Sequence, residues 1–162
     1  MPIKVSVVED EAGIRESLAI LINGSEGFQC LSTFPNAEAA LKRLPQEKPD
    51  VILMDINLPR MSGIDCVREL KARLPGVKIV MHTVFDDEDR LFESLRSGAD
   101  GYLLKRTPAA KLLEALAEVY HGQSPMSGEM ARMVVEFFHE HGRANGTEDL
   151  TPREKEILGQ LA

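Results

Sequence analysis

The feature that most constrains the fold of this chain is a repeated alternation between short apolar runs and segments of helical period. The apolar runs, which we predict to be strands, occupy residues 3–8, 28–34, 51–54, 77–82 and 101–105. Each run is followed by apolar side chains at helical spacing, and the first such stripe consists of Ile14, Leu18, Leu21 and Ile22. The later stripes are Ala37, Ala40, Leu41 and Leu44, then Val67, Leu70 and Leu74, then Leu91, Phe92 and Leu95, and finally Leu112, Leu113, Leu116, Val119 and Tyr120. This pattern predicts five consecutive strand–helix units.

Strands that alternate with helices favour a parallel sheet joined by right-handed crossovers and covered on both faces. The run "VILM" at 51–54 is apolar on both faces and suits a central strand, whereas "FQCLSTF" at 28–34 carries more polar residues and suits an edge. We therefore predict an α/β fold, a flavodoxin-like doubly wound (βα)5 parallel sheet in the order 2-1-3-4-5. In that topology ligands bind at the carboxyl ends of the first and third strands.

The pattern changes after about residue 122. One more amphipathic helix is predicted from Met130, Met133, Val134, Phe137 and Phe138, with Ser127 as its N-cap. The polar, glycine-containing stretch at 139–149 indicates a linker.

A new helix is predicted to start close to the end of the sequence, in "LTPREKEILGQLA". Thr151 and Glu154 have the spacing of a capping box, and Pro152 fits the first helical position. We therefore expect three parts: residues 1–122, a helix and linker at 123–149, and the beginning of another unit at 150–162.

Composition and charge exclude several classes of protein. The formal net charge is -7 and the pI is about 5.1, unlike the basic surface that gives non-specific affinity for nucleic acid. Cys30 and Cys66 lack the spacing of metal ligands and are expected to be reduced thiols in the core. The sequence shows neither a signal peptide nor an apolar run of about 18 residues, so we expect a cytoplasmic protein without a membrane segment.

Polar residues gather where the predicted strands end. Glu9 and Asp10 follow the first strand, Asp55 follows the third, Thr83 the fourth and Lys105 the fifth. In the predicted topology these side chains converge on one edge of the sheet. Two carboxylates about 5 Å apart repel each other by roughly 3 kcal/mol at an effective dielectric constant near 20, equivalent to about two pKa units. Three carboxylates therefore require a cation, and oxygen ligands with room for water favour Mg²⁺ over Ca²⁺.

Such a site is suited to phosphoryl chemistry. If a phosphoryl group joined one carboxylate, the metal, the Lys105 ammonium and the Thr83 hydroxyl could bind its oxygens. Asp55 lies on the central strand, so we expect Asp55 to be the acceptor.

Four motifs carry a resemblance to a known family. The stretches "VVEDE", "LMDINLPRMSG", "HTVFDDEDR" and "GADGYLLK", in this order and spacing, resemble the signature of a response-regulator receiver domain over residues 1 to about 122. The sixth helix and "LTPREKEIL" are similar to the NarL/FixJ subfamily, in which a LuxR-type helix-turn-helix follows the receiver.

The resemblance implies a role for each matching residue. Asp55 matches the phospho-accepting aspartate, and Glu9 and Asp10 match the acidic pair that binds Mg²⁺. Asn57 matches the residue whose backbone carbonyl joins the metal. The residues that match the phosphate-binding and switch positions are Thr83 and Lys105, which contact the phosphate, and Tyr102, which moves with Thr83.

The resemblance also implies a two-component response regulator rather than a typical enzyme. Such a protein accepts its phosphoryl group from a sensor histidine kinase, assists its own phosphorylation and dephosphorylation, and requires Mg²⁺ but no organic cofactor. The implied output is a change of conformation or homodimerisation that controls transcription. DNA would be contacted only by the part of the helix-turn-helix beyond Ala162.

Three alternatives remain open at the level of the sequence. An FMN-binding flavodoxin-like module shares the topology, but "EDEAGIRES" after the first strand would repel a phosphate. A phosphatase or phosphotransferase of the haloacid-dehalogenase type also uses a strand-end aspartate, but it requires a second acid where this chain has Asn57. The third alternative is a receiver that works through protein contacts alone, which only sequence beyond Ala162 would distinguish.

Overall fold

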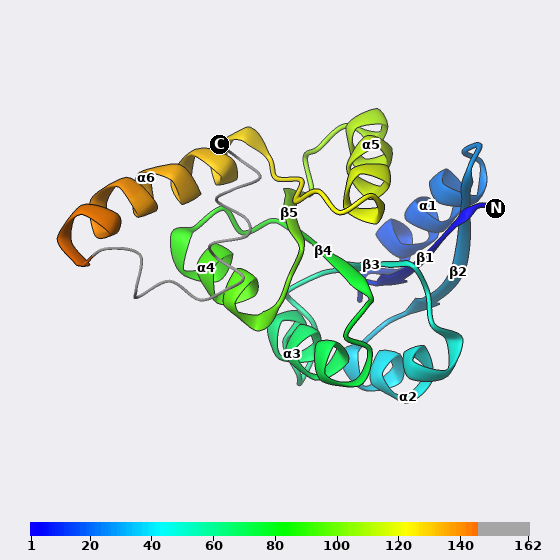
Figure 1. The fold of residues 1–162 in the computed structure, drawn as a ribbon. Coiled ribbons are helices and arrows are strands. Elements are labelled where there is room, and N and C mark those ends of the chain that lie inside the picture. Colours follow the sequence, from blue (N-terminus) through cyan, green and yellow to red (C-terminus); the bar gives the residue numbers. More distant parts are fainter. Residues whose placement is uncertain (146–162) are drawn as a thin grey trace.

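The strands form one parallel sheet, as the alternating pattern predicts. The computed structural model describes residues 1–145, and side chains through residue 140. The sheet contains β1 (Ile3–Val8), β2 (Phe28–Phe34), β3 (Val51–Met54), β4 (Lys78–Thr83) and β5 (Gly101–Leu104). Their order is β2-β1-β3-β4-β5, so the predicted doubly wound topology is confirmed (Figure 1). Every residue of β3 is buried, as expected for the central strand.

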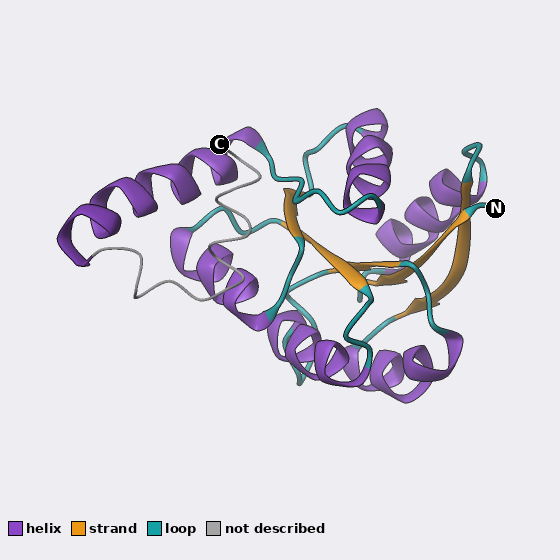
Figure 2. Cartoon of the chain, viewed as in Figure 1, coloured by secondary structure: helices purple, strands orange, loops and turns teal. Residues whose placement is uncertain are grey.

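Helices cover both faces of the sheet (Figure 2). The first five follow the strands in turn: α1 (Ala12–Asn23), α2 (Ala37–Glu47), α3 (Gly63–Arg73), α4 (Glu88–Ser97) and α5 (Ala109–Tyr120). The buried side chains of α1 and α5 form one apolar cluster with β1, β3 and β4, and those of α2, α3 and α4 form a second cluster on the other face. Within residues 1–145, no helix has the length and apolar character needed to span a bilayer.

Side-chain caps fix where three of the helices begin. Asn36, Ser62 and Asp87 each accept a hydrogen bond from the backbone N–H three residues later, at the start of α2, α3 and α4 respectively. Asp87 belongs to the acidic run "DDED", which places negative charge at the positive end of the α4 dipole. The cap on α4 therefore also fixes the end of the loop that joins β4 to α4.

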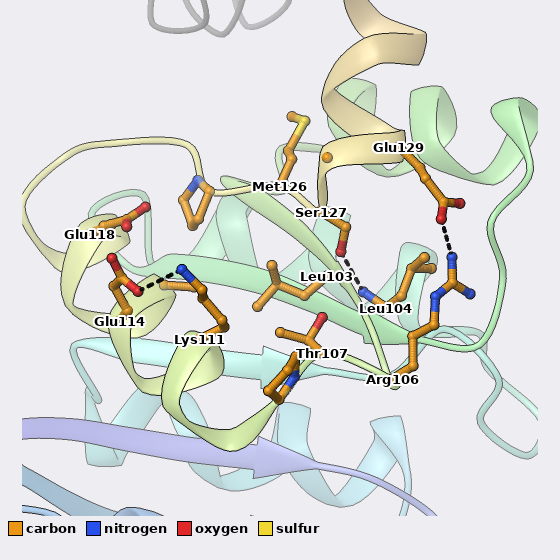
Figure 3. Close-up of a pocket in the computed structure, with 14 residues that line it drawn as sticks. Leu103, Leu104, Arg106, Thr107, Lys111, Glu114, Glu118, Met126, Ser127 and Glu129 are labelled. Carbon is orange, nitrogen blue, oxygen red and sulfur yellow. Dashed lines mark hydrogen bonds and ion pairs between the residues drawn. The ribbon is translucent and has the colours of Figure 1, made fainter.

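The segment at 125–127 covers the outer edge of β5. The N–H of Tyr102 donates to the carbonyl of Pro125 at 2.9 Å, and the N–H of Ser127 donates to the carbonyl of Tyr102 at 3.2 Å. The Ser127 hydroxyl accepts a hydrogen bond from the N–H of Leu104 at 3.1 Å (Figure 3). Ser127 precedes the sixth helix, as predicted, but its hydroxyl oxygen binds the N–H of Leu104 on β5. An edge strand has N–H groups without partners in the sheet, and Ser127 provides an acceptor for one of them.

A pocket of about 440 Å³ lies between this segment and α5. Figure 3 shows that charged side chains rim the pocket, with Arg106 paired to Glu129 and Lys111 paired to Glu114. None of the three predicted metal-binding carboxylates is among its lining residues. The pocket is therefore separate from the predicted site.

The sixth helix, α6 (Gly128–Asn145), packs against α4. Its residues Met130, Val134 and Phe138 are buried in the same apolar cluster as the buried side chains of α4. The ring centroids of Phe92 on α4 and Phe137 on α6 are 4.3 Å apart. The helix continues to Asn145, so the prediction of a linker from residue 139 was wrong for residues 139–145. The remainder of that linker and the predicted helix-turn-helix at 150–162 lie outside the described residues.

Candidate functional site

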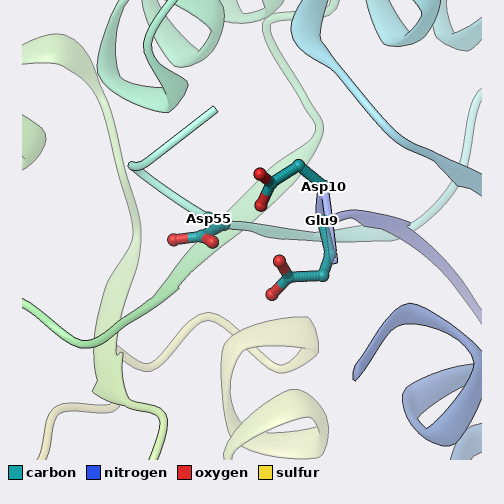
Figure 4. Close-up of side chains that lie close together, drawn as sticks. All are labelled: Glu9, Asp10 and Asp55. Atoms are coloured by element: carbon teal, nitrogen blue, oxygen red, sulfur yellow. The ribbon is translucent and has the colours of Figure 1, made fainter. Parts of the chain in front are cut away.

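The predicted acidic residues meet at the carboxyl ends of β1 and β3. The N–H of Asp55 donates to the carbonyl of Val8 at 3.0 Å, which places the two strand ends side by side. Glu9, Asp10 and Asp55 each offer a carboxylate oxygen, and these oxygens lie within 4.8 Å of one another (Figure 4). Glu9 and Asp55 are only 1% and 4% exposed, whereas Asp10 is exposed. Two buried acids and one exposed acid thus face a common point.

Lys105 balances part of this negative charge. Its Nζ lies 2.8 Å from Asp55 Oδ2 and 2.6 Å from Glu9 Oε1. Burial raises the pKa of Glu9 above its usual value, and the nearby charge of Asp55 adds to that effect, although hydrogen bonds from Lys105 and the Glu11 N–H oppose it. Burial alone would lower the pKa of Lys105, but the hydrogen bonds and charges of Asp55 and Glu9 raise it. Lys105 is therefore held as an ammonium between two acids.

Backbone groups fix the direction of the acidic side chains. The N–H of Glu11 donates to Glu9 Oε2 at 3.1 Å, and the N–H of Asn57 donates to Asp55 Oδ1 at 3.2 Å. The Arg15 guanidinium donates to the carbonyls of Glu9 and Asp10 at 2.9 Å and 3.3 Å. The loop after β1 is thus fastened to α1, and its carboxylates are oriented before any ligand arrives.

Gly63 allows the chain to pass directly behind Asp55. A Cβ at this position would lie 1.9 Å from the backbone oxygen of Asp55, and the N–H of Gly63 donates to the carbonyl of Ile56 at 2.9 Å. The loop from β3 to α3 therefore returns closely enough to contact the strand end, which keeps Asn57 beside Asp55.

Thr83 and Tyr102 both bind the backbone of a third residue, Phe85. The N–H of Phe85 donates to Thr83 Oγ1 at 3.3 Å, and the Tyr102 hydroxyl donates to the Phe85 carbonyl at 2.9 Å. Thr83 and Tyr102 are both fully buried. The Tyr102 side chain, which the family resemblance implies moves with Thr83, thus lies in the interior in this structure.

Sequence reasoning missed Phe85 and a second residue, Arg90. The guanidinium carbon of Arg90 lies 4.0 Å from the centroid of the Phe85 ring. Phe85 follows Thr83 by two residues, which is the one signal that could have indicated it. The contact with Arg90 joins a loop to a helix, so no periodic spacing predicts it.

The donor set fits a divalent cation. Three carboxylates around one point leave two net negative charges after pairing with Lys105, if all of them are ionised. Hard, all-oxygen ligands with one side exposed at Asp10 suit a metal that retains several water ligands, as Mg²⁺ does. The observed carboxylates therefore fit the predicted metal, and Glu9, Asp10 and Asp55 are the side chains that could hold it.

Comparison with known proteins identifies the family. The model of the response regulator receiver domain matches residues 5–117. The chain belongs to the response regulator receiver family. The receiver domain thus accounts for the sheet and its five surrounding helices, and for every site residue described above.

The relatives of this receiver domain include transcriptional regulators. The whole chain is 34% identical over 164 residues to "Uncharacterized transcriptional regulatory protein YxjL" of Bacillus subtilis, and the alignment covers 99% of this chain and 75% of that protein. It is 32% identical over 166 residues to the oxygen regulatory protein NreC of Staphylococcus haemolyticus, covering 98% and 76% of the two chains. The similarity to both proteins extends past the receiver domain, because it covers nearly the whole of this chain.

Solved structures support the same fold. A two-component response regulator of the LuxR family from an Aurantimonas species superposes with a TM-score of 0.80 at 24% identity, covering 85% of this chain and 98% of that chain. The response regulator domain of Thermotoga maritima CheB gives a TM-score of 0.70 at 26% identity, covering 75% and 98%. Because the chain belongs to the receiver family, the FMN-binding and haloacid-dehalogenase alternatives raised by the sequence are set aside.

Proposed function

We propose that this receiver domain accepts a phosphoryl group on Asp55 from a phosphohistidine of a sensor histidine kinase, in a reaction that requires Mg²⁺. The observation that carries the proposal is the position of Asp55: a buried carboxylate 2.8 Å from the Lys105 ammonium, at a point shared with Glu9 and Asp10. Glu9, Asp10, Asp55 and the backbone carbonyl of Asn57 would hold the metal. When bound, Mg²⁺ would neutralise phosphoryl oxygens and lower the repulsion between them and the carboxylates.

In the proposed step an Asp55 carboxylate oxygen attacks phosphorus. An oxygen–phosphorus bond forms, the phosphorus–nitrogen bond of the phosphohistidine breaks, and the imidazole leaves with the electron pair of that bond. Lys105 then exchanges its ion pair with Asp55 for one with a phosphoryl oxygen, and the Thr83 hydroxyl donates to another. The Thr83 oxygen already accepts from the Phe85 N–H, so its own proton remains available for donation. The same groups would assist hydrolysis of the acyl phosphate.

The proposed signal passes from Thr83 to the surface near α4 and β5. Phosphorylation adds negative charge and acceptor oxygens, which draw the Thr83 hydroxyl toward Asp55. Because Thr83 and Tyr102 share Phe85, a shift of Thr83 alters the loop that also anchors the tyrosine hydroxyl. Moving such an equilibrium from 1:99 to 99:1 requires about 5.5 kcal/mol of differential stabilisation, which a few charge-assisted hydrogen bonds supply.

The proposed output is homodimerisation or release of a DNA-binding module that controls transcription. Support comes from the relative YxjL, which is named as a transcriptional regulatory protein and of which this chain covers 75%. We assign residues 1–122 to the receiver, 123–149 to the connecting segment and 150–162 to the start of a LuxR-type helix-turn-helix. DNA would be read by residues beyond Ala162, in agreement with the acidic charge of the present chain.

Intact-mass analysis after incubation with Mg²⁺ and acetyl phosphate tests the proposal. Wild-type protein should gain the mass of one phosphoryl group, and Asp55→Asn should gain none. Asp65→Asn is a matched control, because Asp65 is an exposed acid on α3 that pairs with Arg68. A gain that persists in Asp55→Asn would overturn the acceptor assignment. Omission of Mg²⁺ should abolish the gain in the wild type, and an undiminished gain would refute the metal requirement.

A further inference from the structure

The loop from β4 to α4 is organised around Phe85. Its N–H binds Thr83 and its carbonyl binds Tyr102, so both switch hydroxyls depend on the position of one peptide segment. The Phe85 side chain is half-buried and packs against the apolar cluster that includes α4. Whatever fixes the Phe85 ring therefore also fixes the two hydroxyls.

Arg90 supplies that fixation from the first turn of α4. Its guanidinium carbon lies 4.0 Å from the centroid of the Phe85 ring, within the range of a cation–π contact. Both oxygens of Asp87 bind Arg90: Oδ1 accepts from the guanidinium and Oδ2 from the backbone N–H, each at 3.1 Å. The guanidinium is thus held at one end by the cap of α4 and lies over the aromatic ring.

The same two residues share a pocket with one residue of the candidate site, Asn57. Phe85 and Arg90 line a pocket of about 480 Å³ together with Asn57, which lies beside Asp55. Arg90 therefore lies in a pocket that extends to Asn57, the residue whose N–H binds Asp55.

We propose that Arg90 is a positioning residue for the phosphorylation reaction: by holding Phe85 against α4, it keeps the Thr83 hydroxyl oriented as a donor toward Asp55. This inference rests on the proposed function of Asp55. The sequence of contacts is continuous, from Asp87 through Arg90 and the Phe85 ring to the Phe85 N–H and Thr83 Oγ1. Without Arg90 the loop loses this support, and the hydroxyl spends less time in the reactive orientation.

The test compares rates of phosphoryl gain at saturating Mg²⁺ over a range of acetyl phosphate concentrations. Arg90→Ala should lower the maximal rate about threefold to tenfold, a range expected for loss of one positioning contact. Arg43→Ala is a matched control, because Arg43 lies on α2, outside the site, and its guanidinium carbon is 5.8 Å from the centroid of the Phe34 ring of β2. Its rate should stay within about twofold of the wild type.

Two further variants separate positioning from simple attraction of an anionic donor. Phe85→Leu removes the ring but leaves the charge of Arg90, so a positioning role predicts a lower maximal rate here too. Arg90→Lys keeps a cation that can lie over the face of the ring and should recover most of the rate. If Arg90 only attracts the donor, Phe85→Leu keeps the wild-type rate and Arg90→Ala raises the half-saturating donor concentration without changing the maximal rate, which overturns the proposal.

A spectroscopic signal reports on the loop directly. The chain has two tyrosines, the buried Tyr102 and the half-exposed Tyr120, so fluorotyrosine labelling gives two fluorine resonances that Tyr120→Phe assigns. Arg90→Ala should shift or broaden the Tyr102 resonance, and Arg43→Ala should not. An unchanged maximal rate in Arg90→Ala overturns the role of Arg90 while wild-type phosphorylation stands. Absence of phosphorylation in the wild type overturns the proposed function, and this inference with it.

Discussion

Lys105 and Gly63 show how single residues prepare this site in different ways. Lys105 compensates charge, because its ammonium pairs with the buried carboxylates of Glu9 and Asp55 at once. Gly63 provides space, because any side chain there would meet the Asp55 backbone. Asp55, the proposed acceptor, therefore depends on Lys105 for its electrostatics and on Gly63 for its position.

Replacement of Gly63 by alanine should destabilise the fold. The added Cβ would lie 1.9 Å from a backbone oxygen that cannot move without displacing β3, and we expect a loss of about 3 kcal/mol in the free energy of unfolding. Gly13→Ala is the control, because Gly13 lies in α1 with open space around its Cβ position and alanine favours a helix by about 1 kcal/mol. Urea denaturation of both variants measures the difference. Equal midpoints for Gly63→Ala and wild type would contradict this account.

His82 should make the fold sensitive to mild acid. Burial lowers the pKa of His82 to about 4, and the charge of Lys105 adds to that effect. In the unfolded chain His82 binds a proton near pH 6.5, whereas in the folded chain it stays neutral until about pH 4. The stability that the neutral His82 contributes is therefore fully present above pH 6.5 and is lost as the pH falls toward 4. The difference between the two pKa values corresponds to about 3 kcal/mol.

A comparison of wild type with His82→Leu isolates this contribution. Both proteins share every other acid-sensitive group, so the wild type should lose about 3 kcal/mol more than the variant between pH 6.5 and pH 4 in urea titrations. The exposed His121, replaced by glutamine, serves as the control and should retain the wild-type pH dependence. Parallel pH profiles for wild type and His82→Leu would refute a neutral, buried His82.

At the scale of elements, periodicity predicted the sheet and helices well, and the exceptions have local causes. Residues 77–82 were predicted as a strand, but pairing with β5 shifts β4 to Lys78–Thr83, so Thr83 belongs to the strand and pairs with Leu104. Tyr120 continues the apolar stripe of α5 but is 44% exposed, because it lies at the end of that helix. The polar residues after Phe138 indicated a linker, yet the helix continues to Asn145.

The packing of α6 on α4 should depend on Phe137. Truncation to alanine removes the ring contact with Phe92, and we expect a loss of about 1 to 3 kcal/mol in the stability of α6, since Phe137 is half-buried. Hydrogen exchange should show faster exchange within α6, while the strands keep their protection. Glu136→Ala is the control, because Glu136 is next to Phe137 in the sequence but its own side chain is exposed. Equal acceleration in the strands would indicate that α6 does not open on its own.

For the molecule as a whole, the sheet topology made the candidate site predictable, but the contacts that connect Thr83 to Tyr102 and Arg90 could not be predicted. The order β2-β1-β3-β4-β5 brings the ends of β1, β3, β4 and β5 to one edge, so Glu9, Asp55, Thr83 and Lys105 could be associated before any contact was known. The link from Thr83 through Phe85 to Tyr102 runs through backbone groups, which carry no sequence signal. The same holds for the contact between Arg90 and Phe85, which depends on how α4 is oriented.

Mg²⁺ should stabilise the whole fold through the acidic cluster. A ligand that binds only the folded chain raises the unfolding free energy by about 2.7 kcal/mol at one hundred times its dissociation constant, or about 6 to 10 °C in melting temperature for a chain of this size. Asp10→Asn tests this, because Asp10 is an exposed member of the cluster whose loss should weaken metal binding without disturbing the core. Thermal melts in MgCl₂ and in KCl of equal ionic strength separate binding from screening. Since screening acts on all surface charges, an equal Mg²⁺-dependent shift in both proteins would place the metal elsewhere, whereas a shift confined to the wild type links global stability to the site that surrounds Asp55.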